Sequence, residues 1–295
     1  MIALRLRFWN AGQAVCWAVA VLLGLAGGAQ ATNKPSRIAS LNLCTDQLVL
    51  QLASPERIVS VTYLARDPAI SGVAEKARDI PINHGLAEQI LPLEPDLVLV
   101  GSFTTRPTTA LLRRLGHRVE AIPPATGFDG VRKNIRKVGA LLGEVDRADA
   151  MIRVLDEAFS GLAIAGDRPA AIVLRPRGMT TGKGSLVDEV LRAAGLRNLS
   201  AGMGVTGIGW LSLEQVIAAQ PRLIIAAESE AGHPSLSHLM LRHPAYQAIQ
   251  DHEGRPPQRV NLPAYLWNCG GPQLVEAVQR LSRARQRILN EAQHP

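Results

Sequence analysis

Two kinds of side chain in this sequence could hold a flat, anionic small molecule: aromatic rings and arginine guanidinium groups. Several of them come directly after short apolar runs that are typical of buried strands, and ligands of open α/β sheets bind beyond the carboxyl ends of the strands. Aromatic faces suit a ring system or a catechol, whereas guanidinium forks suit carboxylates or phosphates. These candidate ligand-binding residues are Tyr63, Phe103, Trp267, Arg106 and Arg175, with Arg177 as a weaker candidate.

The elements that would position these side chains occur twice. Leu86–Val100 reads LAEQILPLEPDLVLV and Ser212–Ala226 reads SLEQVIAAQPRLIIA, and the matching Glu, Gln and Pro residues are each 126 positions apart. Each copy predicts a helix, a turn marked by proline and a buried strand. So long a period indicates two similar lobes, with a cleft between them for a small ligand. The same shift relates His84 to Trp210, and both are candidate ligand contacts.

Asn42, Cys44 and Cys269 complete the candidate ligand-binding set, since each follows a predicted strand. A permanent disulfide between the two cysteines, on opposite lobes, would hold a cleft nearly shut and so conflict with repeated opening. The alternatives are two independent core residues, free thiols at the ligand, or metal ligation together with His84, because haem iron accepts histidine or thiolate.

From Arg37 onward the chain alternates short strands with short helices, which predicts an α/β fold with mainly parallel sheets. Two long helical segments, Phe128–Leu142 and Arg147–Leu162, interrupt this alternation. We therefore expect two similar α/β lobes joined by a long connector helix. The predicted boundaries are 32–125 for the N-terminal lobe, 126–166 for the connector and 167–295 for the C-terminal lobe.

Residues 1–31 have the pattern of a cleaved signal peptide: an early positive charge, the apolar stretch Ala14–Ala26, and Ala29-Gln30-Ala31 before the cleavage point. The apolar stretch is shorter than the roughly 20 residues of a membrane-spanning helix. Cleavage would lower the net charge from +7 to about +5. Scattered arginines and an aromatic content of 4% exclude a nucleic-acid-binding protein.

Motifs for catalysis or nucleotide binding are weak. Gly202–Gly207 fits G-x-G-x-x-G but lacks a preceding strand and a suitably placed acid, and Gly178–Gly184 (GMTTGKG) is one residue short of a phosphate-binding loop. The sequence has neither H-E-x-x-H nor G-x-S-x-G. It therefore favours a binding protein without a cofactor over an enzyme, with an exported hydrolase as an alternative.

Taken in order along the chain, four segments resemble the helical-linker class of periplasmic substrate-binding proteins, which serve ABC importers of iron–siderophore complexes, haem and cobalamin. The segments are Arg37–Leu52 (RIASLNLCTDQLVLQL), the repeated Glu-Gln…Pro segments, Thr181-Gly182-Lys183, and Trp267–Pro272 (WNCGGP). The resemblance implies a monomeric periplasmic protein that captures a metal chelate or a corrinoid between its lobes. It also implies delivery of that ligand to an ABC permease dimer in the inner membrane.

Glu88 and Glu214 match the positions at which cobalamin binders of this class dock on permease arginines. Two carboxylates related by the repeat suit a two-fold permease, and carboxylate–arginine contacts orient docking. This sequence departs from the cobalamin binders at Phe103 and near Met179, where their aromatic residues are not cleanly reproduced. It also carries arginines that their pattern lacks. An exported haem or metal carrier with Cys44, His84 and Cys269 as ligands is therefore a further alternative.

Overall fold

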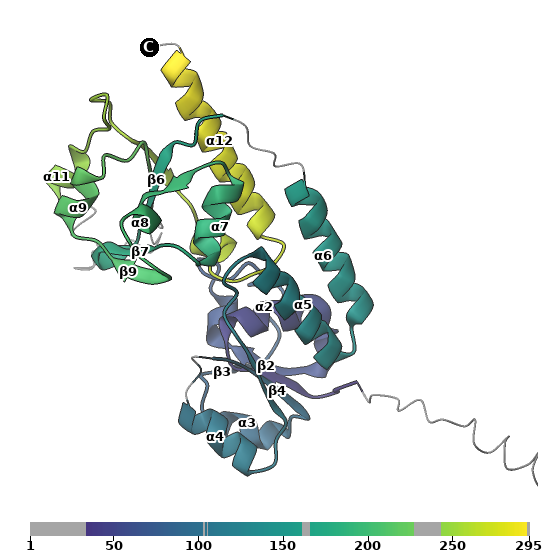
Figure 1. Ribbon diagram of the computed structural model, residues 1–295. Helices are drawn as coiled ribbons and strands as arrows, with labels where there is room; N and C mark the ends of the chain where they lie inside the picture. Colours follow the sequence, from purple (N-terminus) through teal and green to yellow (C-terminus); the bar gives the residue numbers. More distant parts are fainter. Residues whose placement is uncertain (1–33, 103, 105, 161–165, 227–242, 294–295) are drawn as a thin grey trace, which may run out of the picture. The chain divides into compact units, whose positions relative to one another are not determined.

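Two parallel sheets, one from each half of the chain, organise the fold (Figure 1). The computed structural model describes residues 34–102, 104, 106–160, 166–226 and 243–293, and the chain from Pro35 onward forms one compact unit. The predicted signal peptide and Phe103 lie outside the described residues. Within them, no helix combines the length and apolarity needed to cross a membrane.

The N-terminal sheet has five parallel strands in the order β3-β2-β1-β4-β5. Its strands are β1 (Ile38–Ser40), β2 (Ile58–Thr62), β3 (Ile82–Asn83), β4 (Leu97–Gly101) and β5 (Val119–Ile122). The helices between them are α2 (Leu43–Leu52), α3 (Ala87–Ile90) and α4 (Arg106–Arg114). Every crossover therefore places the carboxyl ends of the strands at one edge, where the candidate residues were expected.

The predicted connector is two helices, α5 (Phe128–Leu142) and α6 (Val145–Ser160), that pack against each other. Gly143 ends α5 in the left-handed conformation, with φ of 70°, a conformation that favours glycine. An ion pair of 2.6 Å between Arg132 Nε and Asp156 Oδ1 joins the two helices. A single continuous connector helix is thus replaced by a helical hairpin, because Gly143 turns the chain.

The C-terminal sheet has four parallel strands in the order β11-β10-β6-β8, beside the antiparallel pair β7-β9. The strands are β6 (Ala170–Leu174), β7 (Met179–Thr181), β8 (Arg197–Asn198), β9 (Ile208–Trp210), β10 (Leu223–Ala226) and β11 (Gln258–Asn261). The helices are α7 (Leu186–Ala193), α8 (Leu199–Gly202), α9 (Leu213–Ala218), α11 (Pro244–Gln247) and α12 (Leu274–Gln293). The two sheets thus belong to two α/β lobes.

Alternation along the central strands divides each sheet between two cores. Leu97 and Leu99 of β4 face a large core, whereas Val98 and Val100 face a smaller core of the N-terminal lobe. The large core also contains Val173 of β6 and the buried residues of α5, α6 and α12. A single hydrophobic cluster therefore runs through both lobes and fixes the base on which the candidate site is built.

Candidate functional site

A pocket of about 210 Å³ lies at the carboxyl end of β1 and collects three of the predicted ligand contacts. They are Asn42, Cys44 and Cys269. Asn42 is the N-cap of α2, and its Oδ1 accepts a hydrogen bond of 3.0 Å from the Cys44 amide. The end of β4 requires a glycine at Gly101, because a Cβ there would lie 2.6 Å from the Asn42 side-chain nitrogen.

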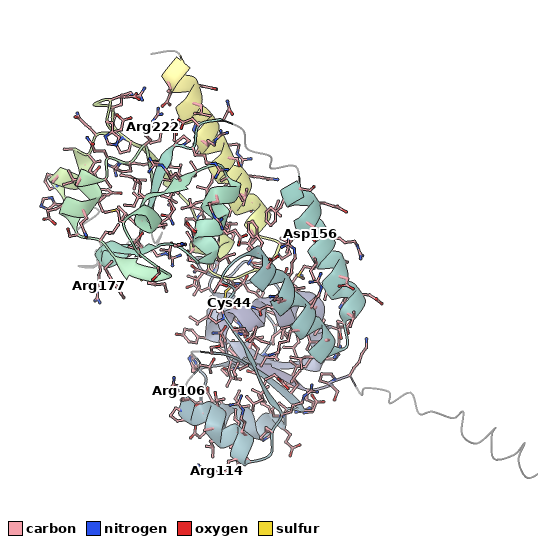
Figure 2. All side chains as sticks on the ribbon, in the orientation of Figure 1. Cys44, Arg106, Arg114, Asp156, Arg177 and Arg222 are labelled. Atoms are coloured by element: carbon pink, nitrogen blue, oxygen red, sulfur yellow. A yellow bond between two sulfur atoms is a disulfide. The ribbon has the colours of Figure 1, made fainter. Side chains whose placement is uncertain are left out.

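Cys44 and Cys269 are joined in a disulfide with a Cα–Cα distance of 5.2 Å. The bond links the first turn of α2 to the turn before α12 (Cys44 is labelled in Figure 2). Two sulfurs bonded to each other are not free thiols and cannot be thiolate ligands, which corrects the metal-ligation alternative. Among the described residues, no three His, Cys, Asp or Glu side chains are grouped to hold a metal ion.

The conflict that we expected between a disulfide and a working cleft has a structural resolution. Trp267, two residues before Cys269, is buried in the hydrophobic cluster that runs through both lobes. The bridge is therefore formed at a place where the two lobes are already packed together. It lines the pocket without having to span an open gap.

A second pocket of about 260 Å³ adjoins the first. The two share Pro124, Ala125, Leu186 and Asn268 as lining residues. Its other lining residues include Arg175, Thr181 and Trp267. The two pockets therefore form one cleft, which brings Arg175 and Trp267 next to Asn42 and the disulfide.

Three buried hydrogen-bond donors around the second pocket have no partner in the described part of the chain. They are Arg175 Nε, Thr181 Oγ1 and Trp267 Nε1. Burial lowers the pKa of Arg175 from its ordinary value. A buried polar group without a partner costs about 1–3 kcal/mol. Three such groups around one pocket indicate a site for a ligand that carries hydrogen-bond acceptors or negative charge.

The antiparallel pair β7-β9 carries an exposed aromatic ring beside this pocket. Trp210 is opposite Met179 in the register, so both side chains lie on one face of the pair. Met179 lines the second pocket, whereas Trp210 does not and is 66% exposed. This exposed indole is therefore available to cover a ligand that is larger than the pocket itself.

Tyr63 and His84 lie outside both pockets and stack on each other, with ring centroids 4.7 Å apart. Tyr63 follows β2 and His84 follows β3, and these strands are parallel neighbours, which explains why the rings meet. Both side chains are exposed. The pair offers a flat surface at the same sheet edge as the cleft.

Two predicted arginines line neither pocket of the cleft. Arg106 is exposed at the start of α4 and Arg177 is exposed between β6 and β7, as labelled in Figure 2. Their contribution to ligand binding stays a prediction, as does that of Tyr63 and His84.

Sequence reasoning missed several lining residues. Pro123 and Pro124 follow β5 directly, so the strand-end rule could have found them. Thr181 belongs to the family-like segment Thr181-Gly182-Lys183 but was not identified as a ligand contact, because the burial of one threonine depends on tertiary packing. A buried acid was also missed: Asp46 of α2 is fully buried, and it accepts hydrogen bonds from the backbone N–H and the hydroxyl of Thr62. Burial raises its pKa from 3.8 to about 7, although bonds from Ser40 and Thr62 offset part of the effect.

The repeated segments have matching roles in the two lobes. Glu88 and Glu214 are exposed in the first turns of α3 and α9. The glutamine that follows each of them accepts a backbone hydrogen bond at the start of its helix, from His84 in one lobe and from Ser212 in the other. A side-chain hydrogen bond with Ser212 lowers the pKa of Glu214, which keeps this carboxylate charged.

Comparison with known proteins identifies the family of this chain. Residues 38–251 match the family described as periplasmic binding protein. The chain belongs to this family. Among its relatives are cobalamin-binding proteins from two strains of Halobacterium salinarum, each 26% identical over 212 residues, or 67% of this chain. The match covers 55% of the length of these curated relatives.

Solved periplasmic binding proteins share the two-lobed fold. The heme-binding protein RhuT from Roseiflexus sp. RS-1 is 25% identical with a TM-score of 0.70, and the alignment covers 86% of this chain and 98% of that one. The vitamin B12 binding protein BtuF of Vibrio cholerae is 21% identical with a TM-score of 0.65, covering 89% and 99% of the two chains. The relatives are binding proteins rather than enzymes, and these two are periplasmic.

Proposed function

We propose that this chain is the periplasmic substrate-binding component of an ABC importer for a metal chelate of the cobalamin, haem or iron–siderophore type. The observation that carries the choice of ligand is the set of three buried, unpartnered donors around the cleft. All three ligand types carry carboxylate, carbonyl or phenolate acceptors at the rim of a flat or bulky metal complex. The names of the relatives support the cobalamin and haem classes.

The proposal extends to the whole chain. Residues 1–31 direct export and are removed, leaving a monomer with lobes at 32–125 and 167–295 joined by residues 126–166. The ligand binds at the edge where the strands of both sheets end, as is usual for open α/β sheets. The extensive core shared by the lobes keeps any closing motion small.

Titration of the mature protein with cyanocobalamin, hemin and ferric enterobactin tests the function. Trp210 and Trp267 are the tryptophans outside residues 1–31, and one lines the cleft while the other lies beside it, so a bound chelate quenches the intrinsic fluorescence. We expect saturable quenching by one of the three compounds, with a reduced amplitude in Trp267→Phe. The absence of saturable binding to all three would refute this ligand class.

Arg175→Met is expected to separate binding from stability. The change removes a buried, unpartnered donor, so the unliganded protein should unfold at the same or a higher temperature. Loss of a charge-assisted hydrogen bond should weaken binding of the identified chelate about 10- to 100-fold. Calorimetric titration and thermal denaturation measure the two effects.

The matched control is Arg153→Met on α6, since Arg153 is exposed, lines neither pocket and is not a candidate ligand contact. It should leave both affinity and melting temperature unchanged. An Arg175→Met protein that melts earlier and binds normally would show that Arg175 is structural.

Glu88→Ala combined with Glu214→Ala tests delivery to the permease. Both side chains are exposed in short helices at repeat-related positions, so the fold and the ligand affinity should be unaffected. We expect uptake of the chelate by whole cells to fall to background. Ligand affinity measured on the purified double variant is the control, and its loss would contradict a docking role.

A further inference from the structure

A further cavity of about 510 Å³, here called the hollow, lies in the C-terminal lobe outside the two pockets of the cleft, and its lining is strongly basic. Its lining includes Arg168, Lys183, Arg192 and Arg197, and the one acidic lining residue is Asp188. Arg168 precedes β6, Lys183 lies in the turn before α7, Arg192 is on α7 and Arg197 is on β8. Four cations therefore converge from four segments and do not belong to one solvated helix face.

These charges are poorly neutralised. The structure shows no hydrogen bond or ion pair for the side chains of Arg168, Lys183 and Arg197 within the described ranges, and all three are exposed. Asp188 already accepts a hydrogen bond of 3.0 Å from Asn198 Nδ2, and its other oxygen is 3.9 Å from Arg192 Nε. One partly occupied carboxylate faces four cations, which leaves a clear excess of positive charge.

Like charges held close together repel, and a multivalent anion relieves that repulsion. Guanidinium groups bind phosphate oxygens in a bidentate manner, and an ammonium group adds a compact point charge. We propose that this hollow binds a multivalent, phosphate-bearing anion. The anion is either a free diphosphate-type compound or the phosphates of neighbouring anionic lipid headgroups, since both present several phosphate oxygens and more than one negative charge.

The hollow is separate from the ligand cleft. Of the residues that line it, only Gly184 also lines the second pocket of the cleft, and none of its four cations does. The turn at Lys183 differs from a nucleotide-binding loop, because side chains from four segments surround the hollow rather than a run of backbone N–H groups. Anion binding at the hollow is independent of which chelate the cleft binds.

Isothermal titration of the mature protein with sodium pyrophosphate at 0.15 M NaCl tests the proposal. The variant that changes the hollow, called the pocket variant, is Lys183→Gln with Arg197→Gln. The control is Lys133→Gln with Arg136→Gln on α5, which removes the same charges from exposed positions outside the hollow. A parallel arm sediments the three proteins with phosphatidylcholine vesicles with and without phosphatidylglycerol.

We expect saturable binding by the wild type and the control, and a loss of at least tenfold in affinity in the pocket variant. Selective loss of pyrophosphate binding identifies a free anion, and selective loss of vesicle binding alone identifies a lipid headgroup. Equal weakening of both variants would overturn the proposal, because it would show a general charge effect. The absence of binding to both probes would also overturn it, as would a loss of chelate affinity in the pocket variant as large as its loss of anion affinity.

Discussion

Removing the disulfide by Cys44→Ala and Cys269→Ala is expected to lower the free energy of unfolding by about 2–5 kcal/mol. The two cysteines are 225 residues apart, so the bridge closes the long segment between them into a loop and restricts the unfolded state strongly. Urea denaturation of the protein without residues 1–31, with and without dithiothreitol, measures the loss. The reductant should weaken the wild type by a similar amount.

The bridge is a single bond, so each single variant should lose nearly as much as the double variant, and the losses should not add. Dithiothreitol should have no effect on the double variant, which controls for other actions of the reductant. Two titratable thiols in the native wild type, together with an unfolding midpoint that does not change when dithiothreitol is added, would contradict the bridge. Because both cysteines line the first pocket, the same variants should also weaken chelate binding.

The buried strands were predictable because parallel strands covered on both faces are continuous apolar runs. The repeat around Pro95 and Pro221 led directly to β4 and β10, and both are central strands of their sheets. The short strands β3 and β8, of two residues each, gave no periodic signal. They form because a neighbouring strand offers hydrogen bonds, which is a tertiary property.

The candidate site was predictable in part for a similar reason. The rule that ligands bind beyond strand ends selected Asn42, Arg175 and Trp267, and the structure brings them to one cleft. The rule could not tell which strand ends lie beside each other, so it did not separate Tyr63 from that cleft. The repeat, which selected His84, carries no information about this either. The pairing of cysteines 225 residues apart also depends on how the two lobes pack, which no local pattern encodes.

Asp46→Asn is expected to remove a pH dependence of stability of about 4 kcal/mol between pH 4 and pH 7. Burial raises the pKa of Asp46 from 3.8 to about 7. Below pH 4 the carboxyl is protonated in both the folded and the unfolded state, and its contribution to stability is fully present. Between pH 4 and pH 7 the unfolded chain ionises while the folded protein keeps the proton, so stability falls as the pH rises.

Urea denaturation of the wild type and the variant across pH 4 to 8 measures this effect as a difference between two curves. The variant should gain on the wild type as the pH rises, because asparagine cannot ionise. Asp96→Asn provides a control, because the pKa of this carboxyl is shifted in the opposite direction. Burial acts to raise the pKa of Asp96, but hydrogen bonds from the N–H groups of Ser36 and Arg37 and from the Ser36 hydroxyl outweigh it and lower the pKa. The stability from Asp96 is therefore lost only as the pH falls below about 4, so between pH 4 and pH 8 the Asp96→Asn curve should run parallel to that of the wild type.

Asp46 also connects stability to the candidate site. Asp46 accepts hydrogen bonds from the backbone N–H and the hydroxyl of Thr62, which is the residue before Tyr63. Cys44 lies two residues before Asp46 on α2. Ionisation near pH 7 therefore places a buried charge between the disulfide and the Tyr63–His84 stack. If the wild type and Asp46→Asn showed parallel stability curves, Asp46 would have to be ionised throughout, and the polar groups around it would have to compensate its burial.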